Sequence, residues 1–213
     1  MKSIVGKKLG MMQEFDEAGR RYALTVVEAQ PGVVLRVKAS ETDGYAAVQG
    51  RVFPGRSEKL NRPDAGQFKK HLQSKAGYRV LREFRVDDPA AFKVGQEITV
   101  ETFAAGDTVD VQGKSIGKGF QGNIKRHHHS RGPMTHGSKN RRESGSIGSA
   151  THLARTVPGR KMPGQMGAKT ATVQKLTVHR IDAEKSLLFI AGGVPGPKGG
   201  TVTVRETTKA RRA

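Results

Sequence analysis

Residues 113–142 read GKSIGKGFQGNIKRHHHSRGPMTHGSKNRR, and the same character continues to residue 170. Residues 113–170 contain 12 Lys and Arg, a single acid (Glu143) and 11 Gly. Such a segment has too little apolar surface to offset the conformational entropy lost on ordering, and its like charges repel one another. It cannot fold by itself, so it divides the chain into an arm and the flanking segments that must build the fold.

The net charge of the chain is concentrated in its second half. The 213 residues carry a formal charge of +19, with a pI near 10.6. Residues 1–110 hold 18 Lys and Arg against 15 Asp and Glu, whereas residues 111–213 hold 20 against 4. This imbalance predicts a polyanionic partner, either a nucleic acid or an anionic membrane surface.

Composition excludes several classes of protein. There is no Cys, which excludes disulfides, thiolate zinc sites and a cysteine nucleophile. The longest apolar run, Leu187–Val194, is far too short to span a bilayer, and the first residues contain no secretory signal. We therefore expect a cytoplasmic, soluble protein without a membrane-spanning segment.

The segments that flank the arm have mostly β character. Short apolar or alternating stretches, separated by turn residues such as Pro31-Gly32, occupy residues 23–29, 33–37, 45–53, 79–86, 96–101, 108–111, 171–181, 187–191 and 201–205. This spacing favours a small barrel or sandwich. Helix signals are few: Asn61–Asp64 begins a stretch carrying Phe68 and Leu72 that ends at Gly77, and residues 88–92 form one turn closed by Gly95.

The expected organisation is a mainly β body with an inserted arm. The body comprises residues 1–112 and 171–213, with a small mixed insertion over 54–95, and the irregular arm spans 113–170. Basic glycine-rich segments more often form disordered linkers than ordered structure. Because structured sequence resumes after the arm, we expect it instead to become ordered when a polyanion neutralises it.

The sequence of the arm does not support catalysis, metal binding or cofactor binding. Gly117–Gly122 fits GxGxxG, but no amphipathic helix follows it, so a dinucleotide site is rejected. The His127–His129 run and His136 lack the carboxylate or thiolate that usually completes a metal site. Paired carboxylates for acid–base catalysis are absent from the arm. No enzyme activity, metal or cofactor is expected.

The scattered apolar residues of the arm distinguish RNA from a membrane. Those between residues 130 and 169 are broken up by Gly and Pro, whereas a membrane-surface helix needs them on one face. An irregular, basic chain tethered at both ends is typical of a segment that penetrates folded RNA, with glycines allowing close approach. A nucleic-acid-processing enzyme and a DNA-compacting protein remain as alternatives.

Several segments together resemble one known family. They are residues 6–15 (GKKLGMMQEF), 103–113 (FAAGDTVDVQG), 117–126 (GKGFQGNIKR), 131–138 (RGPMTHGS), 145–148 (GSIG), 161–167 (KMPGQMG) and 194–196 (VPG). In order and spacing they resemble the large-subunit ribosomal protein L-three family, in its bacterial form. The resemblance spans nearly the whole chain.

This resemblance implies a structural role in the large ribosomal subunit. It implies a β-barrel of the translation-protein type and an arm reaching toward the peptidyl-transferase centre. It also implies direct binding to the large-subunit rRNA near its 3′ end, early in assembly, beside large-subunit proteins fourteen and nineteen. Gln165 matches a glutamine that is N-methylated in some bacterial members, which implies a glutamine methyltransferase as a further partner.

Candidate rRNA-binding residues follow from the charge of the arm. They are Lys114, Lys118, Lys125, Arg126, His127, Arg131, His136, Ser138, Lys139, Arg141, Arg142, Arg155, Arg160, Lys161 and Lys169. Glycines expected to permit close backbone approach are Gly145, Gly148, Gly164 and Gly167.

The chain departs from the family pattern at a few positions. Met12 replaces a usual Thr, the usual His-Arg-x-Pro run is here Arg141–Ser144, and a usual Pro-Gly is here Leu153-Ala154. Losing two prolines loosens the backbone of the arm, and Arg141 replaces a stacking imidazole with a guanidinium.

Overall fold

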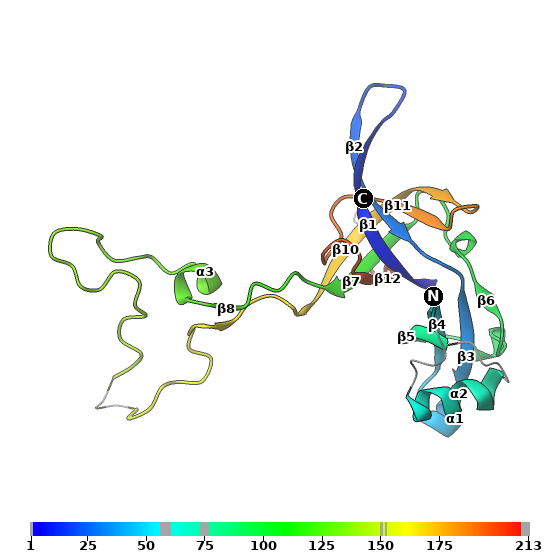
Figure 1. The fold of residues 1–213 in the computed structure, drawn as a ribbon, viewed down its shortest axis with the longest axis horizontal. Helices are drawn as coiled ribbons and strands as arrows, with labels where there is room; N and C mark the ends of the chain where they lie inside the picture. The colour runs from blue at the N-terminus through cyan, green and yellow to red at the C-terminus, as the bar shows by residue number, and fades with distance from the viewer. Residues whose placement is uncertain (1, 56–60, 73–76, 150, 152, 210–213) are drawn as a thin grey trace. The chain divides into compact units, whose positions relative to one another are not determined.

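A computed structural model describes residues 2–55, 61–72, 77–149, 151 and 153–209. The chain forms two compact units, one made of residues 1–114 with 170–213 and the other of residues 115–169. Most regular structure is β, arranged as a closed barrel, a four-stranded sheet and a two-stranded sheet (Figure 1). The expected mainly β fold is confirmed.

The barrel of the first unit closes through six antiparallel strands. Around the barrel the order is β1-β12-β7-β10-β11-β2, and β2 pairs with β1 to complete it. The strands are β1 (Ser3–Phe15), β2 (Arg21–Glu28), β7 (Thr108–Lys114), β10 (Thr170–Asp182), β11 (Leu187–Ala191) and β12 (Thr201–Glu206). Closure removes exposed strand edges from this sheet.

Small aliphatic side chains fill the barrel. Val202 and Val204 alternate with exposed or half-buried neighbours along β12, as the sequence predicts, and point into the same core as Val111. Leu188 and Ile190 come from β11 and are fully buried. β-branched residues suit this position because they pack well on a pleated surface.

One buried carboxylate fixes an irregularity in the barrel wall. Asp110 is 1% exposed, and its Oδ1 accepts a hydrogen bond from the amide of Lys175 at 3.1 Å. Lys175 lies where β10 shifts register against β7 and has a φ of 58°. The Arg205 guanidinium lies 3.8 Å from the other oxygen of Asp110. The buried charge is therefore compensated, as burial requires.

The second sheet lies in the same unit and has the order β5-β4-β3-β6. Its strands are β3 (Gly32–Lys38), β4 (Ala47–Gly55), β5 (Gly77–Arg85) and β6 (Glu97–Ile98). Helix α1 (Ser40–Asp43) follows β3, and α2 (Arg62–Leu72) contacts β3 and buries Phe68. Residues 54–95, which we expected to form a small mixed insertion, therefore contribute β5 to this sheet. Strand β3 lies before that range in the sequence, and β6 lies after it.

Several local expectations differ from the structure. The strand expected over 96–101 is limited to Glu97–Ile98, and Val100–Thr102 forms a 3₁₀ turn because Val100 and Phe103 both turn into the barrel core. The long strand β1 is not predicted from the sequence, since its glycines and lysines hide the alternation. The expected turn at residues 88–92 is present as Pro89–Ala91, capped by the Asp88 side chain. Residues 73–76, before the expected helix stop at Gly77, lie outside the described residues.

Both ends of the 115–169 segment connect to one antiparallel strand pair. Lys114 pairs with Thr170, and Gly113 pairs with Ala171, at the end of β7 and the start of β10. A Cβ on Gly113 would lie 3.1 Å from the Pro195 carbonyl oxygen, so the 192–200 loop packs directly on this strand pair.

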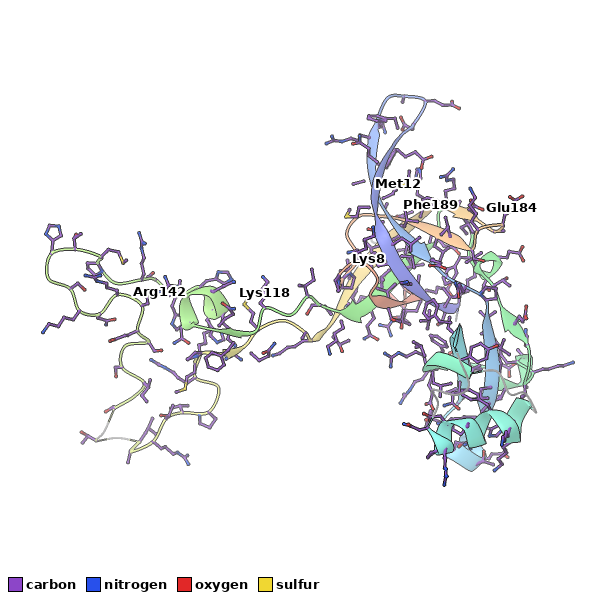
Figure 2. The ribbon with its side chains drawn as sticks, in the orientation of Figure 1. Lys8, Met12, Lys118, Arg142, Glu184 and Phe189 are labelled. Atoms are coloured by element: carbon purple, nitrogen blue, oxygen red, sulfur yellow. The ribbon has the colours of Figure 1, made fainter. Side chains whose placement is uncertain are left out.

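Lys8 ties this loop to the barrel, a role that the sequence did not reveal. Figure 2 labels Lys8. Its Nζ donates to the carbonyl oxygens of Val194 at 2.7 Å and Gly196 at 3.0 Å. Its backbone N–H also donates to the Gly200 carbonyl at 2.9 Å. Lys8 therefore acts within the body, at the strand pair from which the basic segment departs.

We expect Leu188→Ala to destabilise the whole chain by about 2–5 kcal/mol, because it leaves a cavity in a closed core that relaxes little. Urea denaturation followed by circular dichroism measures this loss. The control Leu153→Ala removes the same atoms from a side chain that is 49% exposed, and should change stability by less than about 0.5 kcal/mol. Equal losses in the two variants would contradict this account of the core.

Candidate RNA interface

The second unit, residues 115–169, carries cations that have no carboxylates to pair with. It contains 11 Lys and Arg and one acid, Glu143. In the described part of this unit, Glu143 forms no ion pair. The body differs, because Lys2 pairs with Asp107 at 3.0 Å and Arg36 with Asp43 at 2.6 Å. Residues 115–169 therefore carry a net charge of +10 in 55 residues, whereas the other 158 residues together carry +9.

A third ion pair of the body is bridged by a tyrosine hydroxyl. Lys38 lies 2.7 Å from Glu83, and the Tyr45 hydroxyl accepts from Lys38 at 2.7 Å and donates to Glu83 at 2.8 Å. Hydrogen bonding to Glu83 raises the pKa of Lys38, and hydrogen bonding to Lys38 lowers the pKa of Glu83. Both groups therefore remain charged across the physiological pH range.

A hydrogen-bonded stem forms the base of the second unit. Ser115 donates through its amide to the Lys169 carbonyl at 2.8 Å, and Lys118 donates to Met166 at 2.9 Å. Met166 in turn donates to Gly119 at 2.9 Å. The short strands β8 (Phe120–Gln121) and β9 (Gly164–Gln165) continue this pairing, with Phe120 opposite Gln165. Backbone hydrogen bonds thus hold the two limbs together where apolar packing is scarce.

A short helix follows the stem, where the sequence predicted irregular chain. Helix α3 (Asn123–His127) ends at His128, which has a φ of 58°. Arg126 Nη1 donates to the Met162 carbonyl at 2.6 Å, and His127 Nε2 lies 3.0 Å from the same oxygen. A Cβ on Gly164 would lie 2.6 Å from Arg126 Nη1, so the guanidinium packs directly over the backbone at Gly164.

Asn123 connects α3 to one of the departures from the family pattern. The Asn123 side chain is 4% exposed, and its Nδ2 donates to the Ser144 hydroxyl at 2.7 Å. A proline, which the family resemblance implies at the position of Ser144, could not accept this bond through its side chain. The hydrogen bond therefore gives Ser144 a local anchoring role in place of the fixed backbone of proline.

The outer part of the unit is held by donors that bind backbone carbonyls. Gly132 donates through its amide to the Arg141 carbonyl at 3.0 Å, and Arg141 Nε donates to the Ser138 carbonyl at 3.4 Å. Arg160 Nη2 donates to the Ser146 carbonyl at 2.5 Å. Arg141 and Arg160 therefore contribute to the internal structure of the arm as well as to its charge.

Most of the candidate cations are exposed and uncommitted. In the described part of the chain, ten of the candidate residues are exposed and have side chains that form no hydrogen bond or ion pair: Lys114, Lys118, Lys125, Arg131, His136, Lys139, Arg142, Arg155, Lys161 and Lys169. Lys169 is exposed and bonds to Ser115 through its backbone, and the Ser138 hydroxyl donates to the Asn140 carbonyl at 3.2 Å. Figure 2 labels Lys118 on the limb that leads into β8, and Arg142 in the chain beyond α3. These ten side chains are free to contact an external anion.

The four singled-out glycines fall into two pairs. Gly164 lies against Arg126, and a Cβ on Gly167 would overlap the Ile116 carbonyl oxygen. A Cβ on Gly145 would meet no atom within 4 Å, and one on Gly148 would meet only the Arg155 carbonyl oxygen, at 3.8 Å, among the described residues. At Gly164 and Gly167, other atoms of the protein approach the backbone closely. At Gly145 and Gly148, the space beside the backbone is open to an external partner.

A metal-ligating cluster and a membrane-spanning helix are both absent from the described residues. No group of three or more His, Cys, Asp or Glu there is placed to hold a metal ion, and the rings of His127 and His129 are 6.0 Å apart. None of the helices described in the structure is long and apolar enough to span a bilayer.

Sequence reasoning did not single out two exposed apolar side chains of this unit. Phe120 is 75% exposed and Ile116 is 58% exposed. One feature of the sequence could have identified Phe120: it is the sole Phe, Tyr or Trp between residues 115 and 169.

Comparisons with known proteins agree with the resemblance seen in the motifs. The family model described as ribosomal protein L3 matches residues 72–213. The large ribosomal subunit protein uL3 of Thermosynechococcus vestitus is 47% identical over 201 residues, which cover 94% of this chain and 94% of that protein.

We expect Gly167→Ala to open the stem, because its φ of 71° and the Ile116 carbonyl both exclude a Cβ. Hydrogen exchange should show lost protection of the Lys118 and Met166 amides. The matched control Gly148→Ala places its Cβ at an ordinary contact distance and should leave both amides protected. Unchanged protection in Gly167→Ala would refute the stem geometry.

Proposed function

This chain belongs to the ribosomal protein L3 family, and we propose that it is a non-catalytic structural constituent of the large ribosomal subunit that binds large-subunit rRNA through residues 115–169. The observation that carries the proposal is the set of exposed cations in a unit that has one acid and a hydrogen-bonded stem. A charged surface without internal partners is the electrostatic pattern of a phosphate-binding element.

The two units have different tasks in this proposal. The barrel provides a stable attachment, because its core is closed and the body pairs Lys2, Arg36 and Lys38 with carboxylates. The basic arm supplies counter-charge between phosphates inside folded RNA. Gly145 and Gly148 allow close approach of the backbone to RNA, which Cβ atoms would hinder.

The finer assignments rest on the family resemblance. We propose that the protein binds the rRNA near its 3′ end, nucleates assembly of the subunit and extends its arm toward the peptidyl-transferase centre. Large-subunit proteins fourteen and nineteen are the proposed protein neighbours. The ribosome in the cytoplasm is the proposed location.

Gln165 is proposed as a site of N-methylation by a glutamine methyltransferase. Its side chain is exposed, and its Nε2 donates only to the adjacent Met166 carbonyl, at 3.3 Å, among the described contacts. An amide in this position is accessible to an enzyme before the arm enters RNA. This accessibility supports the proposal.

Salt dependence of rRNA binding tests the phosphate role directly. With about seven phosphate contacts, the log–log slope of affinity against salt for the full chain should be near −5. Replacing three uncommitted cations, in the triple variant Arg131→Gln, Lys139→Gln and Arg142→Gln, should make the slope less negative by about 2. Filter binding to a large-subunit rRNA fragment between roughly 50 and 300 mM salt is a suitable measurement.

The control variant alters cations that already have carboxylate partners. Lys2→Gln, Arg36→Gln and Lys38→Gln remove the same formal charge from the body and should leave the slope unchanged. Equal changes in the two triple variants would show that net charge, and not the arm, determines binding.

A further inference from the structure

Phe120 occupies an unusual position for an aromatic side chain. It is 75% exposed, more than any other large apolar side chain in the described part of the chain. It is also the sole Phe, Tyr or Trp in residues 115–169, which otherwise carry mainly Gly, polar and basic residues. The ring therefore presents an apolar face on the most basic unit of the protein.

The backbone beneath Phe120 is fixed on both sides. Phe120 pairs with Gln165 across β8 and β9, and the stem bonds at Gly119 and Lys118 lie immediately before it. Asn123, three residues later, is buried and bonded to Ser144. The ring thus projects from a preorganised support, so little backbone entropy is lost when a partner contacts it.

Gln165 places an amide next to the ring. Residues directly opposite in an antiparallel pair have Cβ atoms about 5 Å apart on the same face. Gln165 is exposed, and its Oε1 has no partner among the described contacts. An aromatic face beside an amide oxygen without a partner is a combination by which proteins stack an unpaired base and hydrogen-bond to its edge.

We propose that Phe120 and Gln165 form a nucleobase site, in which one unpaired RNA base stacks on the Phe120 ring while Gln165 Oε1 accepts a hydrogen bond from the edge of that base. The inference deepens the proposed function and rests on it. The charge around the ring favours RNA over an apolar protein partner, because Lys118 lies two residues before it and the sequence holds no acid between Asp110 and Glu143. Phosphates flanking the stacked base would meet these cations.

Variants at Phe120 separate stacking from charge. For the full chain and the same rRNA fragment, Phe120→Leu should weaken binding by about fivefold to a hundredfold, while the salt slope stays unchanged because no phosphate contact is lost. Phe120→Tyr keeps the ring and should bind nearly as tightly as the unsubstituted chain. Lys118→Gln should instead make the salt slope less negative by about 1.

Ile116→Ala is the matched control, since Ile116 is a 58% exposed apolar residue on the same limb, and it should leave affinity unchanged. Unchanged affinity in Phe120→Leu, together with a less negative slope in Lys118→Gln, would overturn the nucleobase site and leave the proposed function standing. Equal weakening in Phe120→Leu and Ile116→Ala would also overturn it. Failure of the unsubstituted chain to bind the rRNA fragment would refute both proposals.

Discussion

Electrostatic repulsion within residues 115–169 is the constraint on which the rest of the structure depends. Eleven cations with one carboxylate cannot be packed together in a protein interior, because an unpaired buried charge is too costly. The segment therefore remains open, with most of its basic side chains exposed. Its order comes from backbone hydrogen bonds and from arginines that donate to carbonyls, such as Arg126 to Met162.

The body must remain folded although it carries this highly charged segment. Closing six strands into a barrel buries valine, leucine and isoleucine without leaving a sheet edge. The two ends of the segment join neighbouring strands. The pairing of Lys114 with Thr170 is therefore kept although the segment is inserted between them. Lys8 stabilises the loop that packs on this strand pair, because its Nζ donates to two carbonyl oxygens of the loop. The stability of the body is thereby kept separate from the charge of the arm.

Much of the β structure could be predicted, since alternation at Val202 and Val204 and the apolar run at 187–191 are local signals. β1 escaped prediction because its glycines and lysines hide the alternation, and its first residues pair with β12, far along the chain. The 3₁₀ turn at Val100 depends on the barrel core. In the candidate site, charge identified the basic side chains. It could not show that Arg126 binds Met162 or that Phe120 lies opposite Gln165, because both depend on pairing between limbs that are far apart in the sequence.

Crosslinking of assembled large subunits, with protein–RNA crosslinks mapped to single residues, tests the central claim most directly. The account predicts that the crosslinks concentrate in residues 115–169, at uncommitted side chains such as Lys118, Lys125 and Arg142. Crosslinks confined to the barrel and the four-stranded sheet would contradict it, because the unpaired cations would then lie away from the RNA.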